Sequence, residues 1–198
     1  MLRKILTLVL VCSLSSIKAY EVFFAPYEGP FPVSIESRFD GYVWHDFDSK
    51  PAHLAHTSFS FNGYVRYPDT NYLFKFGTFI EGWSRYVRRV GIDLQFGKYW
   101  EDKGALRIGL MYDGIGIGGD YWFVYKDRFK WLTTLEGGAV FPNECDFGHR
   151  FKPFIRWSNR LFVFSTLYVS FGIDHIHYSN EHSPFSFTQG FIGFGSTI

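Results

Sequence analysis

Apolar and polar residues alternate along most of this chain, and this pattern restricts the fold more than any other feature of the sequence. The clearest run lies in 88–100, where apolar side chains occupy every second position: Val90, Ile92, Leu94 and Phe96. Successive side chains of a β-strand point to opposite faces, so each such run predicts a strand with one apolar and one polar face.

Seven such runs and three strand-like segments with weaker alternation (116–125, 160–174 and 185–196) follow one another along the chain. We therefore expect an all-β protein of about ten strands, with eight or twelve as the alternatives. The aromatic content of 22%, which includes 24 Phe, fits strands better than helices. The expected strands are 32–44, 56–67, 71–81, 88–100, 104–113, 116–125, 128–141, 150–157, 160–174 and 185–196. Turn-forming residues separate several of them, at Pro68-Asp69, 101–104, Lys126-Asp127 and Ser158-Asn159.

Two architectures fit strands that have one apolar and one polar face. A periplasmic sandwich or a lipocalin-like barrel buries the apolar faces, whereas a membrane barrel turns them towards lipid. Charged residues in the middle of the strands, strand lengths of about ten residues and aromatic residues near strand ends favour the membrane barrel. These aromatic residues are Trp44, Tyr67, Trp83, Tyr99, Trp100, Tyr125 and Trp157. We therefore expect an antiparallel, up-and-down transmembrane β-barrel.

The first 19 residues have the features of a secretory signal peptide. Arg3 and Lys4 precede the mostly apolar stretch 5–14, and small residues follow before Ala19. We expect cleavage after residue 19 and an outer-membrane barrel domain over 20–198. The expected partners are outer-membrane lipids and the barrel-insertion machinery. This machinery reads the alternating apolar residues of a barrel's last strand, and here Ile192, Phe194 and Ile198 share one face of that strand.

Charge and cysteine content exclude several classes of function. Without residues 1–19 the net charge is −2, which argues against a nucleic-acid-binding protein. Cys12 leaves with the signal peptide and Cys145 then stands alone, so no internal disulfide and no cysteine-based zinc site is expected. No cofactor or metal is expected.

The polar faces of the expected strands carry charges of both signs. In a narrow barrel, opposite charges that face the interior pair and fill it, so we expect a plugged lumen; a small porin is an alternative. The expected lumen charge network consists of Arg89, Asp93, Arg107, Asp120, Lys130, Glu136 and Arg156. Further inward residues are expected at Glu36, Arg38, Asp40, Lys75, Glu81, Gln95, Arg150 and Lys152.

Short motifs follow one another in a distinctive order through the second half of the chain. They include Leu94-Gln95-Phe96-Gly97-Lys98, Leu106-Arg107-Ile108-Gly109-Leu110, Gly116-Ile117-Gly118-Gly119-Asp120-Tyr121, Lys126-Asp127-Arg128-Phe129, Phe151-Lys152-Pro153-Phe154 and Leu167-Tyr168-Val169-Ser170-Phe171-Gly172-Ile173-Asp174. This order resembles the β-rich C-terminal region that follows the lipid-binding domain in some MCE (MlaD-like) proteins. The resemblance covers roughly 92–198, and residues 20–90 contain no MCE domain. It implies an outer-membrane β-region that serves lipid homeostasis of the envelope.

The segment His177-Tyr178-Ser179-Asn180 is similar to the H-x-S-N motif of PagL-type lipid A deacylases. Residues i and i+2 of a strand share a face, which would allow His177 to activate Ser179 as a nucleophile. The family's acid lies about a dozen positions after the serine, where this chain has Phe191. The leading expectation is therefore a non-enzymatic outer-membrane barrel with a structural or lipid-handling role, and a lipid hydrolase is the alternative.

Overall fold

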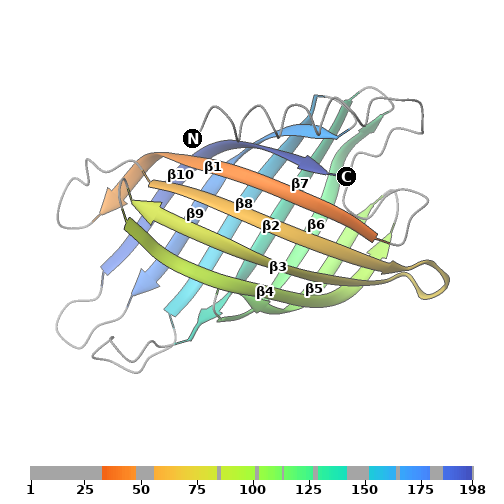
Figure 1. Cartoon of the computed structure of the whole chain (residues 1–198), viewed down its shortest axis with the longest axis horizontal. Helices are drawn as coiled ribbons and strands as arrows, with labels where there is room; N and C mark the ends of the chain where they lie inside the picture. The colour runs from red at the N-terminus through yellow and green to blue at the C-terminus, as the bar shows by residue number, and fades with distance from the viewer. Residues whose placement is uncertain are drawn as a thin grey trace.

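In a computed structural model, the chain forms a closed barrel of ten antiparallel strands (Figure 1). The structure describes residues 33–47, 56–83, 86–100, 103–112, 114–126, 129–141, 152–163, 166–178 and 185–197. The expected all-β, antiparallel barrel of about ten strands is thus confirmed. The expected signal peptide, Arg150, Ser179 and Cys145 lie outside the described residues.

The strands follow the periodic runs of the sequence closely, except that the single expected strand 160–174 is interrupted between residues 162 and 167. They are β1 (Val33–Phe47), β2 (His56–Tyr67), β3 (Tyr72–Trp83), β4 (Tyr86–Trp100), β5 (Gly104–Met111), β6 (Gly114–Lys126), β7 (Phe129–Val140), β8 (Lys152–Phe162), β9 (Leu167–Tyr178) and β10 (Phe185–Thr197). A short 3-10 helix, Pro68–Thr70, lies between β2 and β3. No helix among the described residues is long and apolar enough to cross a membrane.

Each strand pairs with its neighbour in the sequence, and β10 closes the barrel by pairing with β1. The closing pair is extensive, since its register runs from Glu36 opposite Thr197 to Phe47 opposite Phe187. A closed sheet leaves no edge strand with unpaired backbone groups, and this holds whether water or lipid surrounds it.

One expected turn is wrong. Ser158 and Asn159 lie inside β8, which continues to Phe162, and β9 begins at Leu167. Ser158 stands opposite Thr134 of β7 and Gly172 of β9, so its backbone is paired on both sides. The Asn159 side chain accepts a hydrogen bond from the Trp131 indole at 2.9 Å. Pairing with two neighbouring strands outweighs the local turn preference of a Ser-Asn sequence.

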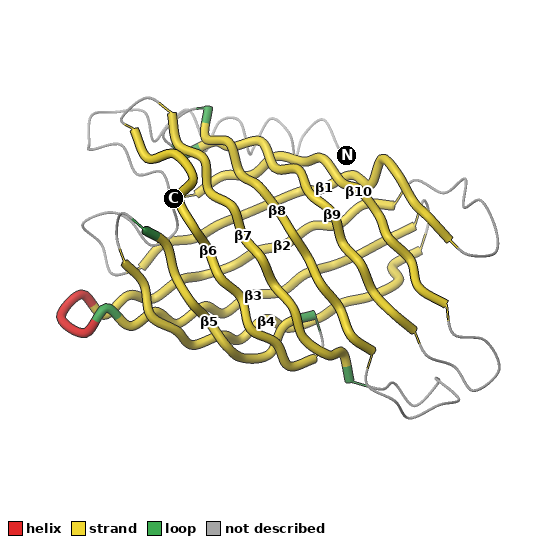
Figure 2. The backbone as a smooth tube through the Cα atoms, turned by 180° about the vertical axis from the view of Figure 1, so that it is seen from behind, coloured by secondary structure: helices red, strands yellow, loops and turns green. Residues whose placement is uncertain are grey.

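The two ends of the barrel differ in their connections. At the turn end, segments 68–71, 101–103, 127–128 and 163–166 join the strands, and β1 begins and β10 ends there. At the loop end, segments 48–55, 84–85, 112–113, 141–151 and 179–184 join them. Figure 2 shows the 3-10 helix projecting from the turn end.

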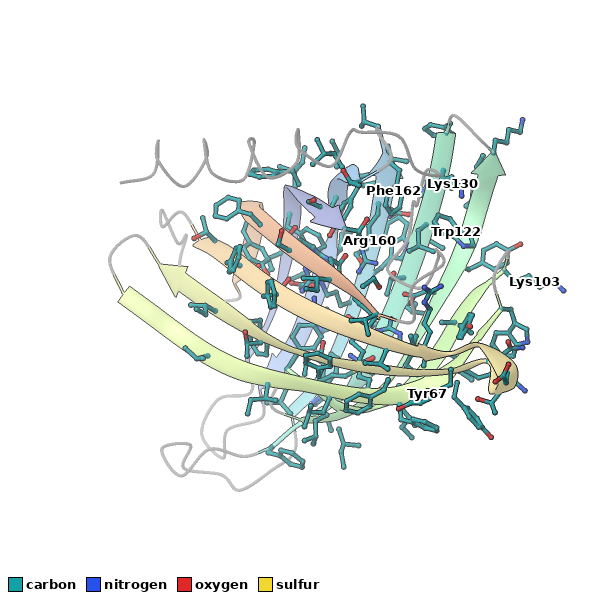
Figure 3. All side chains as sticks on the ribbon, turned by 45° about the vertical axis from the view of Figure 1, so that its right-hand side comes forward. Tyr67, Lys103, Trp122, Lys130, Arg160 and Phe162 are labelled. Carbon is teal, nitrogen blue, oxygen red and sulfur yellow. The ribbon has the colours of Figure 1, made fainter. Side chains whose placement is uncertain are left out.

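The two faces of the barrel wall have opposite chemical character. Along β1, the side chain of Ile35 is 42% exposed on the outside, whereas Glu36 is 1% exposed on the inside. The same alternation continues around the barrel, with charged and polar side chains buried and large apolar side chains exposed (Figure 3). The alternation of the sequence therefore separates an apolar outer wall from a polar interior.

Candidate functional site in the barrel interior

The interior is divided into three layers along the barrel axis. Apolar side chains close the turn end, where they form one cluster: Tyr64, Leu73, Tyr99, Ala105, Trp122, Leu132, Phe162 and Tyr168. A smaller apolar cluster of Met111, Val140 and Phe154, with Tyr112 packed against it, lies near the loop end. Charged side chains occupy the layer between them. We call this middle layer the charged band.

Glu36 of β1 is the centre of the first cluster of the charged band. It accepts hydrogen bonds from Tyr168 of β9 at 2.6 Å and from Tyr64 of β2 at 2.8 Å. Asn62 donates a third hydrogen bond at 3.3 Å, and the Nε atom of Arg160 lies 3.4 Å from the carboxylate. The donors come from β2, β8 and β9, so this single side chain connects four strands across the interior.

A second cluster of the charged band is centred on Asp40 and Arg156. The Asp40 carboxylate accepts hydrogen bonds from Arg38 at 2.8 and 2.9 Å, from Ser170 at 2.8 Å and from Arg156 at 2.9 Å. Arg156 also lies 3.2 Å from Asp174. The Arg156 guanidinium stacks on the Phe191 ring, 4.5 Å from its centroid. Cations and carboxylates thus alternate, which offsets the desolvation of each buried charge.

The third cluster joins β4 to β7. Arg107 donates to Asp120 and to Gln95, each at 2.8 Å, and its Nη2 lies 3.7 Å from Glu136. Thr134 donates a further hydrogen bond to Asp120 at 2.7 Å. Lys75 and Gln95 both contact Asp93, which extends this cluster towards β3.

Tyr112 covers the charged band from the loop end. It lies in the tight connection between β5 and β6 and has a φ of 51°, a conformation that a bulky residue rarely adopts. Its hydroxyl donates to Glu136 at 2.8 Å and accepts from Arg156 at 3.0 Å. Its ring packs between Phe79 and Phe154, at centroid distances of 5.5 and 5.3 Å. These contacts hold the unusual backbone in place.

The cavity that the described residues enclose inside the barrel is small. A cavity of about 30 Å³ lies in the charged band, between Glu36, Asp40, Lys75, Glu136 and Arg156. Its volume is enough for one or two water molecules and too small for an acyl chain or a metabolite. Glycines on the inner face of β6 provide the room for the large side chains: a Cβ atom at Gly118 would lie 3.2 Å from the Glu136 side chain.

The comparisons with known proteins find one family. Residues 62–195, from β2 to β10, match the family model of a lipocalin-like domain. The chain belongs to the lipocalin-like domain family. No curated protein and no solved structure matches it. The resemblances to MCE-type proteins and to PagL-type deacylases are not part of this match and stay predictions.

This lipocalin-like barrel brings together several of the residues expected in the lumen charge network. Arg107, Asp120 and Glu136 lie in one cluster, and Asp93 contacts Lys75 beside it. Arg156 lies in the neighbouring cluster. Lys130 lies nearer the turn end, with its ammonium 5.7 Å from the centroid of the Trp122 ring (Figure 3). Arg89 is in β4, and its side chain is outside what the structure describes.

Two charged residues that are central to these clusters of the lipocalin-like barrel were not expected in the lumen from the sequence. Arg160 pairs with Glu36, and Asp174 pairs with Arg156. The misplaced turn at Ser158-Asn159 interrupted the alternation. Had the run continued through it, Arg160 would have shared the inner face with Arg156.

The expected catalytic pair of the hydrolase alternative is only partly described. His177 lies in β9 next to its end, but its side chain, like Ser179, is outside the described residues. The geometry of this pair therefore stays a prediction. Within the described residues, no group of three or more His, Cys, Asp or Glu side chains is placed to hold a metal ion.

Proposed function

We propose that this lipocalin-like protein is a membrane-spanning β-barrel of the outer membrane with a plugged lumen, and that it has a structural or lipid-handling role in the cell envelope. The observation that carries the proposal is the apolar outer wall around a charged interior. A soluble barrel of the same fold would have the opposite arrangement.

Every strand contributes to the apolar wall. Large apolar side chains that are more than one-third exposed include Val33, Phe59, Phe74, Val90, Leu106, Ile115, Phe129, Ile155, Ile173 and Ile192, one from each strand in order. An apolar surface that encircles a protein is far larger than the patches of a few hundred Å² that water-soluble monomers expose. In the hydrocarbon core of a membrane the same surface has no cost.

The backbone supports the same conclusion. Hydrocarbon offers no hydrogen-bonding partners, so only structures that satisfy their backbone internally can span a membrane. The closed ring from β1 to β10 satisfies this condition. Outer-membrane barrels typically have short periplasmic turns at one end and longer loops at the other. In this barrel the longer connections, 48–55, 141–151 and 179–184, all lie at the loop end, although 84–85 and 112–113 at the same end are short. The expected signal peptide agrees with this location.

The family relationship suggests contact with lipid, and the packing of the interior restricts where that contact takes place. A barrel that carries a lipid inside needs an apolar cavity of several hundred Å³. The interior of this barrel contains ion pairs and a cavity of about 30 Å³. We infer that the protein meets lipid through its outer wall, as a component of the membrane and not as a soluble carrier.

The proposal is tested by the effect of one charge on the outer wall. Ile108 lies in β5, is 60% exposed and faces outwards between Phe96 and Ile117. In a membrane, Ile108→Lys should destabilise the barrel by about 2–4 kcal/mol, whereas Ile108→Leu should have almost no effect. In water, the lysine would be harmless because the position is already exposed.

The measurement is urea unfolding of the folded chain in phospholipid vesicles. The folded fraction at each urea concentration is read from the heat-dependent shift of its migration in detergent gels. Equal stability of the Lys and Leu variants would contradict the membrane location. Recovery of the wild-type chain in a detergent-free aqueous extract would contradict it as well.

A further inference from the structure

Charge is distributed very unevenly between the two faces of the barrel. Among the strand residues whose side chains the structure describes, Lys98 and Lys126 are the charged residues that face outwards. Both lie near the turn end. No carboxylate among these same residues faces outwards, so the described outer wall carries only positive charge.

Lys98 is surrounded by exposed aromatic side chains. It stands opposite Tyr72 of β3 and Leu106 of β5, and Trp100 follows it on the same face of β4. Tyr72 and Trp100 are 44% and 42% exposed, and Tyr67, opposite Tyr72 in the pairing of β2 with β3, is 54% exposed. We call these five residues the Lys98 patch: Tyr67, Tyr72, Lys98, Trp100 and Leu106.

The patch lies at the height where a membrane changes from hydrocarbon to headgroups. Trp100 is the last residue of β4 and Tyr67, labelled in Figure 3, is the last of β2, so both are at the turn end. Lys98 is two residues further into the wall, about 7 Å along the strand. A lysine side chain can cover this distance by extending along the wall until its ammonium reaches the polar interface. Tyrosine and tryptophan prefer the same interface.

Among the residues that the structure describes, Lys98 has no partner to neutralise it. Within the described part of the chain, no ion pair or hydrogen bond involves its ammonium. An unpaired cation at the edge of an apolar wall attracts the phosphate of a lipid headgroup. The nearby Tyr72 hydroxyl and Trp100 indole add hydrogen-bond donors for phosphate or ester oxygens.

We propose that the Lys98 patch binds the headgroup phosphate of an anionic phospholipid, whose acyl chains lie along the apolar wall formed by β3, β4 and β5. The inference rests on the proposed membrane location and adds the class of lipid and the place of contact. It also sets the depth of the barrel in the membrane, because the phosphate layer is then level with Trp100.

The test is native mass spectrometry of the folded full chain in detergent, with equal amounts of phosphatidylglycerol and phosphatidylcholine. The wild-type adduct with one lipid should favour phosphatidylglycerol on the order of fivefold. Lys98→Gln should lower this ratio to about one. Lys103→Gln removes the same charge from the connection between β4 and β5, where the side chain extends beyond the strands (Figure 3), and should keep the wild-type ratio.

A wild-type ratio near one would overturn the inference, and so would an equal loss of preference in both variants, which would indicate a general effect of net charge. Vesicle insertion of the same samples separates this result from the proposed function. A barrel that inserts without preferring the anionic lipid contradicts the Lys98 site alone. A barrel that stays in the aqueous phase contradicts both proposals.

Discussion

Replacing Glu36 by glutamine should destabilise the barrel far more than the change of one atom suggests. Glutamine has nearly the same volume, so the packing around Tyr64 and Tyr168 is kept and no cavity forms. The substitution removes the negative charge that faces Arg160 at 3.4 Å in the buried interior. The two tyrosines donate to different oxygens of the carboxylate, and glutamine keeps only one of these oxygens, so one of the two acceptors is also lost.

The magnitude follows from these contacts. Leaving a buried cation without its partner costs about 3–5 kcal/mol. Charge-assisted hydrogen bonds are roughly twice as strong as neutral ones, but their weakening overlaps with the loss of the ion pair. We expect a decrease of about 4 kcal/mol in the free energy of unfolding. The double variant Glu36→Gln/Arg160→Met should lose about 2 kcal/mol less unfolding free energy than the two single variants lose together.

Urea unfolding in vesicles, monitored by tryptophan fluorescence, measures these differences. Ser37→Ala is the matched control, because Ser37 is the next residue of β1 and lies on the outer face; its effect should stay within about 0.5 kcal/mol. A loss below about 1 kcal/mol for Glu36→Gln would refute the reasoning. So would strict additivity of the Glu36 and Arg160 changes.

Three further outcomes are expected. Gly195→Ala should cost about 1–3 kcal/mol of unfolding free energy, because its Cβ would lie 2.2 Å from the Tyr168 ring, whereas Gly119→Ala, whose nearest contact is 3.9 Å, should be neutral in the same assay. The wild-type barrel should show no large steady conductance in planar bilayers, since ion pairs fill its lumen; a stable pore would make it a porin. Mass spectrometry of lipid A should give identical spectra for cells expressing wild type and Ser179→Ala, and loss of an acyl chain with the wild type alone would establish the hydrolase.

Much of the fold was predictable because it depends on local alternation. In β4, the exposed residues Val90, Ile92, Leu94 and Phe96 were assigned to the apolar face from sequence alone, and the structure confirms it. The prediction failed at Ser158-Asn159, where local turn preference opposed strand pairing with β7 and β9. Such pairing partners are distant in sequence, and a local pattern contains no information about them.

The partners within the interior were less predictable than its charged character. Arg107 and Asp120 lie on adjacent strands, 13 positions apart, and their pairing follows from the order of the strands. Arg156 and Asp40 are 116 positions apart, and Tyr168 and Glu36 are 132 apart. These contacts cross the barrel, so they exist only once the sheet has closed.

By itself, the sequence determined the strands, the face to which each residue points and the mixture of charges that one face carries, because a strand places alternate side chains on opposite sides. The sequence favoured a polar interior, and the tertiary structure established it and decided which charges neutralise each other. The same alternation fits a soluble barrel turned the other way, and the polar face becomes the interior only when β10 pairs with β1 around it. The tilt and register of ten strands then set the heights at which Glu36 meets Arg160 and Asp40 meets Arg156, and these heights depend on all the strand pairings together.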